Sequence, residues 1–145
     1  MQNQLAAILG LLLALAACDS SIYGDDNGVQ PIYDDNTAFV LVGQEVPAGK
    51  LDYYLFDFNL GLTVEENTAE LQEGLRQNPL GSAYMGIVGP DAKHNLAVIK
   101  QLMQQQKDAT YPDKTIIYIG PARNENTVRE LLAPLKAHVR YVVYP

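Results

Sequence analysis

The chain has 145 residues, of which 48% are apolar and 19% are charged, a composition that fits one folded domain and excludes wholesale disorder. Its formal net charge of −7 argues against a nucleic-acid-binding surface, because such a surface would repel phosphates. Residues 37–77 carry seven acids and two bases, and residues 91–145 carry five acids and eight bases. This uneven distribution favours either oriented docking or simple solubility.

An apolar run opens the chain, from Leu5 to Ala17, with no charged or strongly polar side chain. As a helix, this run would be roughly 20 Å long, whereas the hydrocarbon core of a bilayer is roughly 30 Å thick. The run therefore fits the apolar region of a secretory signal better than a transmembrane span. It ends in Leu15, Ala16, Ala17 and Cys18, and Cys18 is the only cysteine of the chain.

These four residues resemble the lipobox of bacterial lipoproteins, in which a leucine and two small residues precede a cysteine. The resemblance implies that a diacylglycerol is attached to the Cys18 sulfur, that residues 1–17 are removed as a signal peptide, and that a third acyl chain such as palmitate joins the new amino group. Two or three chains anchor durably, whereas one binds reversibly. Asp19, directly after the lipidated position, favours the inner membrane over the outer, with the folded domain facing the periplasm.

Residues 18–36 comprise the lipidated cysteine and a segment rich in Gly, Pro, Ser, Asn and Asp. This composition predicts a flexible, acidic tether, because it lacks the apolar surface needed to offset the entropy of ordering. The spacing of Asp25 and Asp26 does not meet the EF-hand pattern, so we expect no calcium site there. Residues 37–145 are expected to form a single α/β domain.

The first two elements of that domain are predicted as strands. Thr37–Gly43, TAFVLVG, is a short apolar run, and Leu51–Phe58 is a second run whose alternate residues are largely apolar on both faces. This pattern predicts a second strand that is covered on both sides. Thr63 and Glu66 then form a capping-box pattern, which predicts the start of a helix over residues 64–77.

The remaining elements alternate strictly between strand and helix. We expect a strand over 83–88, a helix over 91–107, a strand over 115–119, a helix over 124–137 that is kinked or split at Pro134, and a strand over 139–144. The order β-β-α-β-α-β-α-β predicts a three-layer α/β sandwich with a mostly parallel, five-stranded sheet. The first strand is free to lie antiparallel at an edge, because its connection is too short for a crossover.

Two strand ends carry the same turn, Gly89-Pro90 and Gly120-Pro121, each leading into a helix. The likeness indicates either a repeated strand-turn-helix unit or only the shared demands of a tight turn. Neither turn matches a nucleotide-binding glycine motif. A ligand site would lie at the carboxyl ends of the parallel strands, near a topological switch point. The candidate ligand-binding residues there are Asp57, Asn59, Asp91, His94, Arg123 and Asn124, with Lys93 and Glu125 beside them.

Catalysis is not indicated by any motif. The two histidines, His94 and His138, are too few and too far apart in the sequence for a metal site. No G-x-S-x-G motif occurs, and the pair Glu65-Glu66 is explained by the dipole of the helix that it begins. We therefore expect a protein that is not an enzyme and holds neither metal nor cofactor.

The function that these patterns favour is a membrane-anchored lipoprotein whose periplasm-facing domain binds an envelope protein. Secretion, pilus, conjugation and envelope-assembly machines use such accessories, and immunity or exclusion lipoproteins belong to the same physical class. The alternative is a small-molecule-binding protein or minor enzyme that uses the strand ends, and a spacer without a specific ligand is a third reading. A pocket lined by Asp91, His94 and Arg123 would favour the alternative, and an exposed apolar patch would favour a protein partner.

Overall fold

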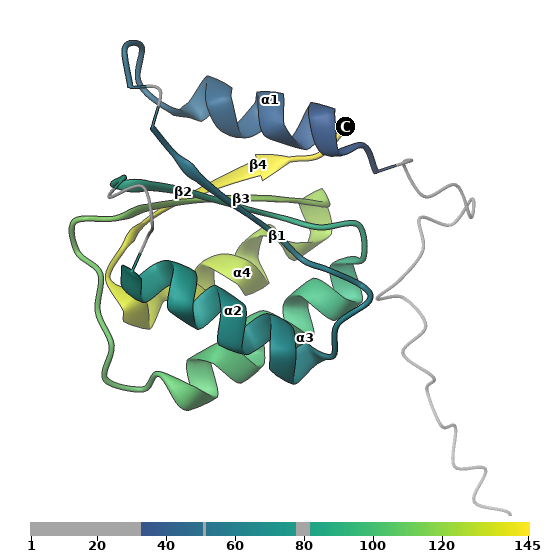
Figure 1. Cartoon of the computed structure of the whole chain (residues 1–145), viewed down its shortest axis with the longest axis vertical. Helices are drawn as coiled ribbons and strands as arrows, with labels where there is room; N and C mark the ends of the chain where they lie inside the picture. The colour runs from purple at the N-terminus through teal and green to yellow at the C-terminus, as the bar shows by residue number, and fades with distance from the viewer. Residues whose placement is uncertain (1–32, 51, 78–81) are drawn as a thin grey trace, which may run out of the picture.

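The computed structural model describes residues 33–50, 52–77 and 82–145. Its elements alternate as α-β-α-β-α-β-α-β (Figure 1). Their bounds are α1 Asp35–Glu45, β1 Tyr54–Asp57, α2 Val64–Gln77, β2 Tyr84–Val88, α3 Ala92–Gln105, β3 Thr115–Gly120, α4 Glu125–Leu132 and β4 His138–Val143. The predicted signal segment, Cys18 and all but the end of the predicted tether lie outside the described residues.

The sheet has four strands in the order β1-β2-β3-β4, and every pair is parallel. Met85 of β2 lies between Tyr54 of β1 and Ile116 of β3, and Ile116 in turn lies beside Val139 of β4. The α/β class and the parallel pairing are thus confirmed. The prediction of five strands is wrong, and no strand in the described ranges is antiparallel.

The error lies in Thr37–Gly43, which forms the middle of α1 instead of a strand. A short apolar run cannot be assigned to a strand or a buried helix by its periodicity alone. Asp34 caps this helix, because its Oδ2 accepts the backbone N–H of Thr37 at 2.7 Å. Ala38 and Val42, one turn apart, are then both fully buried against the sheet.

Helices cover both faces of the sheet, with α1 on one face and α2, α3 and α4 on the other (Figure 1). Alternate residues of β3 reach the two cores. Ile116 and Tyr118 belong to the larger core beneath α2, α3 and α4, whereas Ile117 and Ile119 belong to the smaller core beneath α1. The predicted cover on both faces of the strand Leu51–Phe58 is confirmed in the same way, since Phe56 joins the larger core and Leu55 the smaller one.

The strand order explains why α1 stands apart from the other helices. Parallel crossovers are right-handed, so strands that are added in one direction place every crossover helix on the same face. The order β1-β2-β3-β4 never reverses. The described sheet therefore has no topological switch point, and its second face must be covered by a helix from outside the crossovers.

Several local predictions are confirmed at the level of hydrogen bonds. The Thr63 N–H donates to the Glu66 carboxylate at 2.8 Å, and the Glu66 N–H donates to the Thr63 hydroxyl at 3.2 Å, which forms the capping box at the start of α2. The predicted split at Pro134 is also present. Helix α4 ends at Leu132, and a separate 3-10 turn follows over Ala133–Leu135.

The close packing of α1 on the sheet can be tested at Gly86 of β2. A Cβ atom at this position would lie 2.7 Å from both methyl groups of Val42 and 2.9 Å from Leu55. We expect Gly86→Ala to lower the free energy of unfolding by about 1–3 kcal/mol, because α1 must move away from the sheet. Urea denaturation followed by circular dichroism measures this change.

Gly43 of α1 provides the matched control. A Cβ atom there would meet nothing nearer than the Tyr53 hydroxyl at 3.4 Å, so Gly43→Ala is expected to be neutral or to stabilise by up to about 1 kcal/mol. A Gly86→Ala variant as stable as the parent protein would contradict the close contact between α1 and β2.

Candidate functional site

The six residues predicted at the strand ends fall into three separate clusters. The first contains Asn59, Asp91 and His94 around the start of α2 and α3, the second contains Asp57 beside α1, and the third contains Arg123 and Asn124 at the start of α4. Alternation along β1 causes the first separation, since Asp57 follows Phe56 and its side chain turns to the opposite face of the sheet.

Asn67, in the first turn of α2, is the centre of the first cluster, and its side chain is fully buried. Its Oδ1 accepts the backbone N–H of Asn59 at 2.9 Å, and its Nδ2 donates to the Asn59 carbonyl oxygen at 2.8 Å. These two bonds fix the orientation of the amide and tie the loop after β1 to α2. Asn67 was not among the predicted residues, although a polar residue on the apolar face of a predicted helix was a signal for it.

His94 connects this cluster to α3. Its Nε2 lies 3.0 Å from Nδ2 of Asn67, and because that nitrogen can only donate, Nε2 of His94 must accept. Asp91 has a local role as well, since its Oδ1 accepts the backbone N–H groups of Lys93 at 2.8 Å and His94 at 3.0 Å and caps α3.

The second cluster fastens the incoming chain to the domain. The Tyr33 ring stacks on the Tyr144 ring with centroids 5.5 Å apart, and the Tyr144 hydroxyl accepts the backbone N–H of Asp34 at 2.8 Å. The Tyr33 hydroxyl also donates to Asp57 Oδ1 at 3.5 Å. The first described residues are thereby held against the end of the chain, at the carboxyl ends of the strands.

Electrostatics make Asp57 an unfavourable carboxylate at neutral pH. Partial desolvation raises its pKa above the ordinary value, the nearby charge of Asp35 raises the pKa further, and the hydrogen bond from Tyr33 partly offsets both effects. The pKa of the Tyr33 hydroxyl is also raised, first by burial and then by the charges of Asp57 and Asp35. Tyr33 therefore remains a hydrogen-bond donor.

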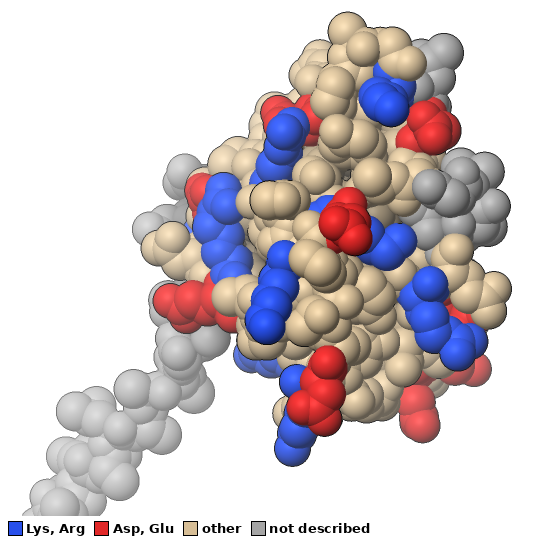
Figure 2. All heavy atoms as spheres, turned by 90° about the vertical axis from the view of Figure 1, so that its left-hand side faces the viewer, with Lys and Arg blue, Asp and Glu red and all other residues tan. Residues whose placement is uncertain are grey.

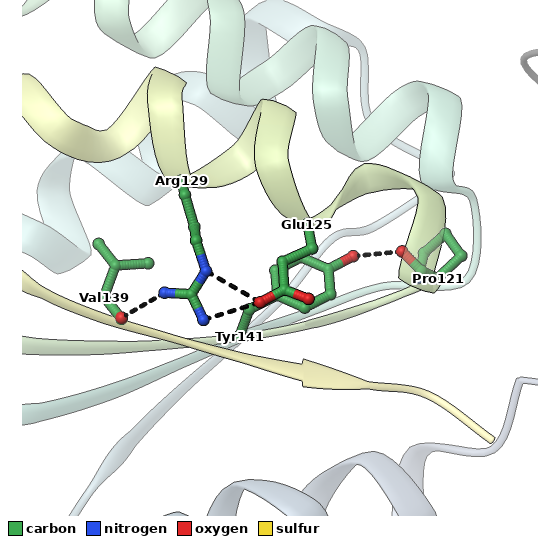
Figure 3. Close-up of polar contacts among 5 residues, drawn as sticks. All are labelled: Pro121, Glu125, Arg129, Val139 and Tyr141. Carbon is green, nitrogen blue, oxygen red and sulfur yellow. Dashed lines mark hydrogen bonds and ion pairs between the residues drawn. The ribbon is translucent and has the colours of Figure 1, made fainter.

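Arg123 and Asn124, the third cluster, lie in the 3-10 turn Ala122–Asn124, where the Asn124 backbone N–H donates to the Pro121 carbonyl at 2.9 Å. Side chains of α4 and β4 beside this turn protect the edge of the sheet (Figure 3). Arg129 of α4 donates from Nε to Glu125 at 3.0 Å and from NH1 to the backbone carbonyl of Val139 at 3.0 Å. Because β4 is an edge strand, this guanidinium occupies a carbonyl that would otherwise be open to another strand. Tyr141 beside it donates to the Pro121 carbonyl at 2.6 Å, and burial followed by the charge of Glu125 raises its pKa.

The two helices α2 and α3 begin in related ways. Asn95, in the first turn of α3, is buried and donates from Nδ2 to the Gly89 carbonyl at 3.0 Å. Asn67 makes the corresponding bond to the loop after β1. Each asparagine ties a helix to the loop that precedes it.

Apart from the link between Asn59 and His94 through Asn67, the predicted residues do not converge on a common ligand position. Within the described residues there is no group of three His, Cys, Asp or Glu side chains that could hold a metal ion. No helix in the described ranges is long and apolar enough to cross a membrane. Comparison of the chain with family models, curated proteins and solved structures gives no match, so the site rests on geometry alone.

An exposed apolar surface lies on α1 instead. Phe39 is 51% exposed and Val40 is 55% exposed, and we call these two residues the outer face of α1. The Phe39 ring contacts the Tyr53 ring with centroids 5.3 Å apart. At the far end of the helix, NH1 of Arg140 lies 3.5 Å from the Glu45 carboxylate and donates to the Glu45 backbone carbonyl at 2.6 Å.

Replacement of Asn67 by alanine tests whether its side chain holds the loop after β1 against α2. We expect Asn67→Ala to lower the free energy of unfolding by about 1–3 kcal/mol, because the backbone groups of Asn59 lose their partner. Asn126→Ala is the control, since Asn126 is exposed on α4, and it should change stability by less than about 0.5 kcal/mol. Equal effects of the two substitutions in urea denaturation would contradict the assignment.

The pKa of Asp57 predicts a pH-dependent substitution effect. The unfolded state loses the Asp57 proton first as the pH rises through the ordinary value of 3.8, so ionisation of this group disfavours the folded state above that value. Asp57→Asn should therefore be slightly more stable at about pH 7, by less than about 1 kcal/mol because solvent screens the charge, and equal to the parent at about pH 3. Denaturation at both pH values measures this, with the exposed Asp113→Asn as control. A loss of stability at neutral pH would instead make Asp57 a stabilising acceptor.

Proposed function

We propose that this protein is a lipid-anchored component of the bacterial envelope whose periplasm-facing domain binds a protein partner through the outer face of α1. In this proposal the domain is a three-layer sandwich, and α1 alone forms the layer that docks. The observation that carries the proposal is the exposure of Phe39 and Val40, at 51% and 55%, as neighbours on one helix.

Single exposed apolar residues are common on protein surfaces. Whether Phe39 and Val40 indicate a docking surface therefore depends on the rest of the helix. Ala38 and Val42 form the side of α1 that packs on the sheet, and both are fully buried. A helix that served only to cover the sheet would carry polar residues at its outward positions. Burial of each exposed side chain on a partner would contribute roughly 1–3 kcal/mol.

Charge at the ends of α1 describes the partner further. Asp34 and Asp35 begin the helix, whereas Glu45 at its other end is already paired with Arg140 at 3.5 Å. A complementary partner would offer an apolar groove with basic residues at its rim. An anionic membrane surface fits less well as the target, because its headgroups would repel the carboxylates.

The predicted lipid anchor supports the same face. Tyr33 and Asp34 are held against Tyr144 at the carboxyl ends of the strands, and α1 follows directly. The segment from Cys18 to Tyr33 would reach at most roughly 50 Å when fully extended. A partner bound to α1 would thus be kept near the membrane, with the inner membrane preferred because of Asp19. A binding role is favoured over catalysis because the strand-end residues do not converge.

Site-specific photo-crosslinking tests the proposal in cells. A photoreactive amino acid at Val40 of the full-length chain should give a discrete protein adduct, and the same group at Lys100, exposed on α3, should not. Phe39→Ser should reduce the Val40 adduct by removing half of the apolar face. Cys18→Ala should reduce it as well, by releasing the chain from the membrane.

The result that contradicts the proposal is the absence of any adduct at Val40 above the level at Lys100. An adduct that persists unchanged in the Cys18→Ala form would retain the docking face and contradict the dependence on the lipid anchor. Mass spectrometry of the mature N-terminus in the same samples reports whether Cys18 carries acyl chains.

A further inference from the structure

A groove lies at the opposite end of the molecule from the strand-end residues. It has a volume of about 610 Å³ and runs between the ends of α2 and α3 and the segment that follows α3. Its lining includes Gln72, Gln104, Gln105, Gln106, Lys107 and Tyr111. Its volume is within the range of small-ligand sites, which measure roughly 300–1,000 Å³.

Side-chain amides dominate this groove, and an amide presents both a donor and an acceptor. The charged groups around it are balanced. Arg76 is paired with Glu73 at 2.8 Å, and Lys107 is followed directly by Asp108. Figure 2 looks onto the edge at which α2 and α3 end, where Lys and Arg are spread over the surface with Asp and Glu among them. The lining therefore favours ligands that form hydrogen bonds over ligands that carry a net charge.

Helix ends reinforce the preference for a neutral ligand. Helices α2 and α3 both reach the groove with their carboxyl-terminal turns, where unpaired carbonyls carry partial negative charge. This field disfavours phosphate or carboxylate ligands. Hydroxyl and amide N–H groups are the ligand donors that match carbonyls at a helix end.

Gln106 gives the groove a fixed wall. It is only 7% exposed, its backbone N–H donates to the Leu102 carbonyl at 2.9 Å, and its Oε1 accepts the Tyr111 hydroxyl at 3.1 Å. Its Nε2 has no hydrogen-bond partner among the described residues. Tyr111 is itself held by a 2.7 Å bond from its N–H to the Leu135 carbonyl, and its ring packs against the larger core. The Gln106 amide is thus held beside a positioned aromatic ring.

We propose that this groove binds a neutral carbohydrate chain, and that sugars bearing acetamido groups fit it best. Vicinal hydroxyls are donors and acceptors at once, as the glutamine amides are, and an acetamido group can pair with an amide through two hydrogen bonds. The Tyr111 ring supplies an apolar surface for the C–H face of a sugar. This site is independent of the outer face of α1, so either can fail without the other.

Saturation-transfer difference NMR and calorimetry test the proposal on the full-length chain in a polyoxyethylene detergent, which has no sugar headgroup. The probe is a β-1,4-linked tetramer of N-acetylglucosamine, compared with a glucose tetramer of the same linkage and with an anionic galacturonate tetramer. We expect a dissociation constant of about 1 mM or below for the acetylated tetramer, weaker binding of the glucose tetramer and no binding of the anionic one.

Variants assign the binding to the groove. Gln104 and Gln105 are exposed, so their joint replacement by alanine should leave the melting temperature unchanged and weaken binding at least about fivefold. Gln44→Ala, exposed on α1, is the matched control and should bind as the parent does. Tyr111→Phe keeps the ring and frees Gln106, and an intermediate loss is expected.

Three results would each overturn the proposal. The first is no binding of the acetylated tetramer at about 10 mM, the second is equal binding by the Gln104 and Gln105 double variant, and the third is equal or tighter binding of the galacturonate tetramer.

Discussion

The whole domain depends on one requirement, which is that the second face of the sheet be covered. Four parallel strands laid down in one direction place all three crossover helices on a single face. The other face would expose Ile117 and Ile119 to water if α1 did not lie over them. Because α1 crosses the middle of the sheet, it requires the small residue Gly86 beneath it, where Val42 makes the closest approach. The size of the side chains at Val42 and Gly86 is therefore tightly constrained.

How far the sequence predicted the structure differs from element to element. The start of α2 and the split at Pro134 were predicted correctly because their signals are local, in the Thr63 and Glu66 pair and in the proline ring. Helix α1 was predicted as a strand because its conformation is decided by distant parts of the chain. Val42 must meet a sheet formed by residues further along, and a run of seven residues is too short to show a period that would reveal this requirement.

The candidate residues illustrate a second limit. Sequence reasoning placed them at the strand ends, but it could not determine which face each side chain would reach. Asp57 lies with Tyr33 on the α1 side, while Asn59 lies with Asn67 on the other side. Neither Asn67 nor Asn95 was predicted, because one polar residue within an apolar helix face is weak information until its backbone partner is known. The amide groove was missed for a similar reason, since Gln72 and Gln106 come from separate helix ends.

The hydrogen bond from the Arg129 guanidinium to the Val139 carbonyl would matter for a protein anchored at a membrane surface. Lipid anchoring would confine many copies to two dimensions, and encounters between neighbours would then be far more frequent than in free solution. A six-residue edge strand such as β4 would recruit a neighbouring strand under such crowding if its carbonyls were open. By occupying the Val139 carbonyl, Arg129 would leave such a strand one acceptor fewer with which to pair.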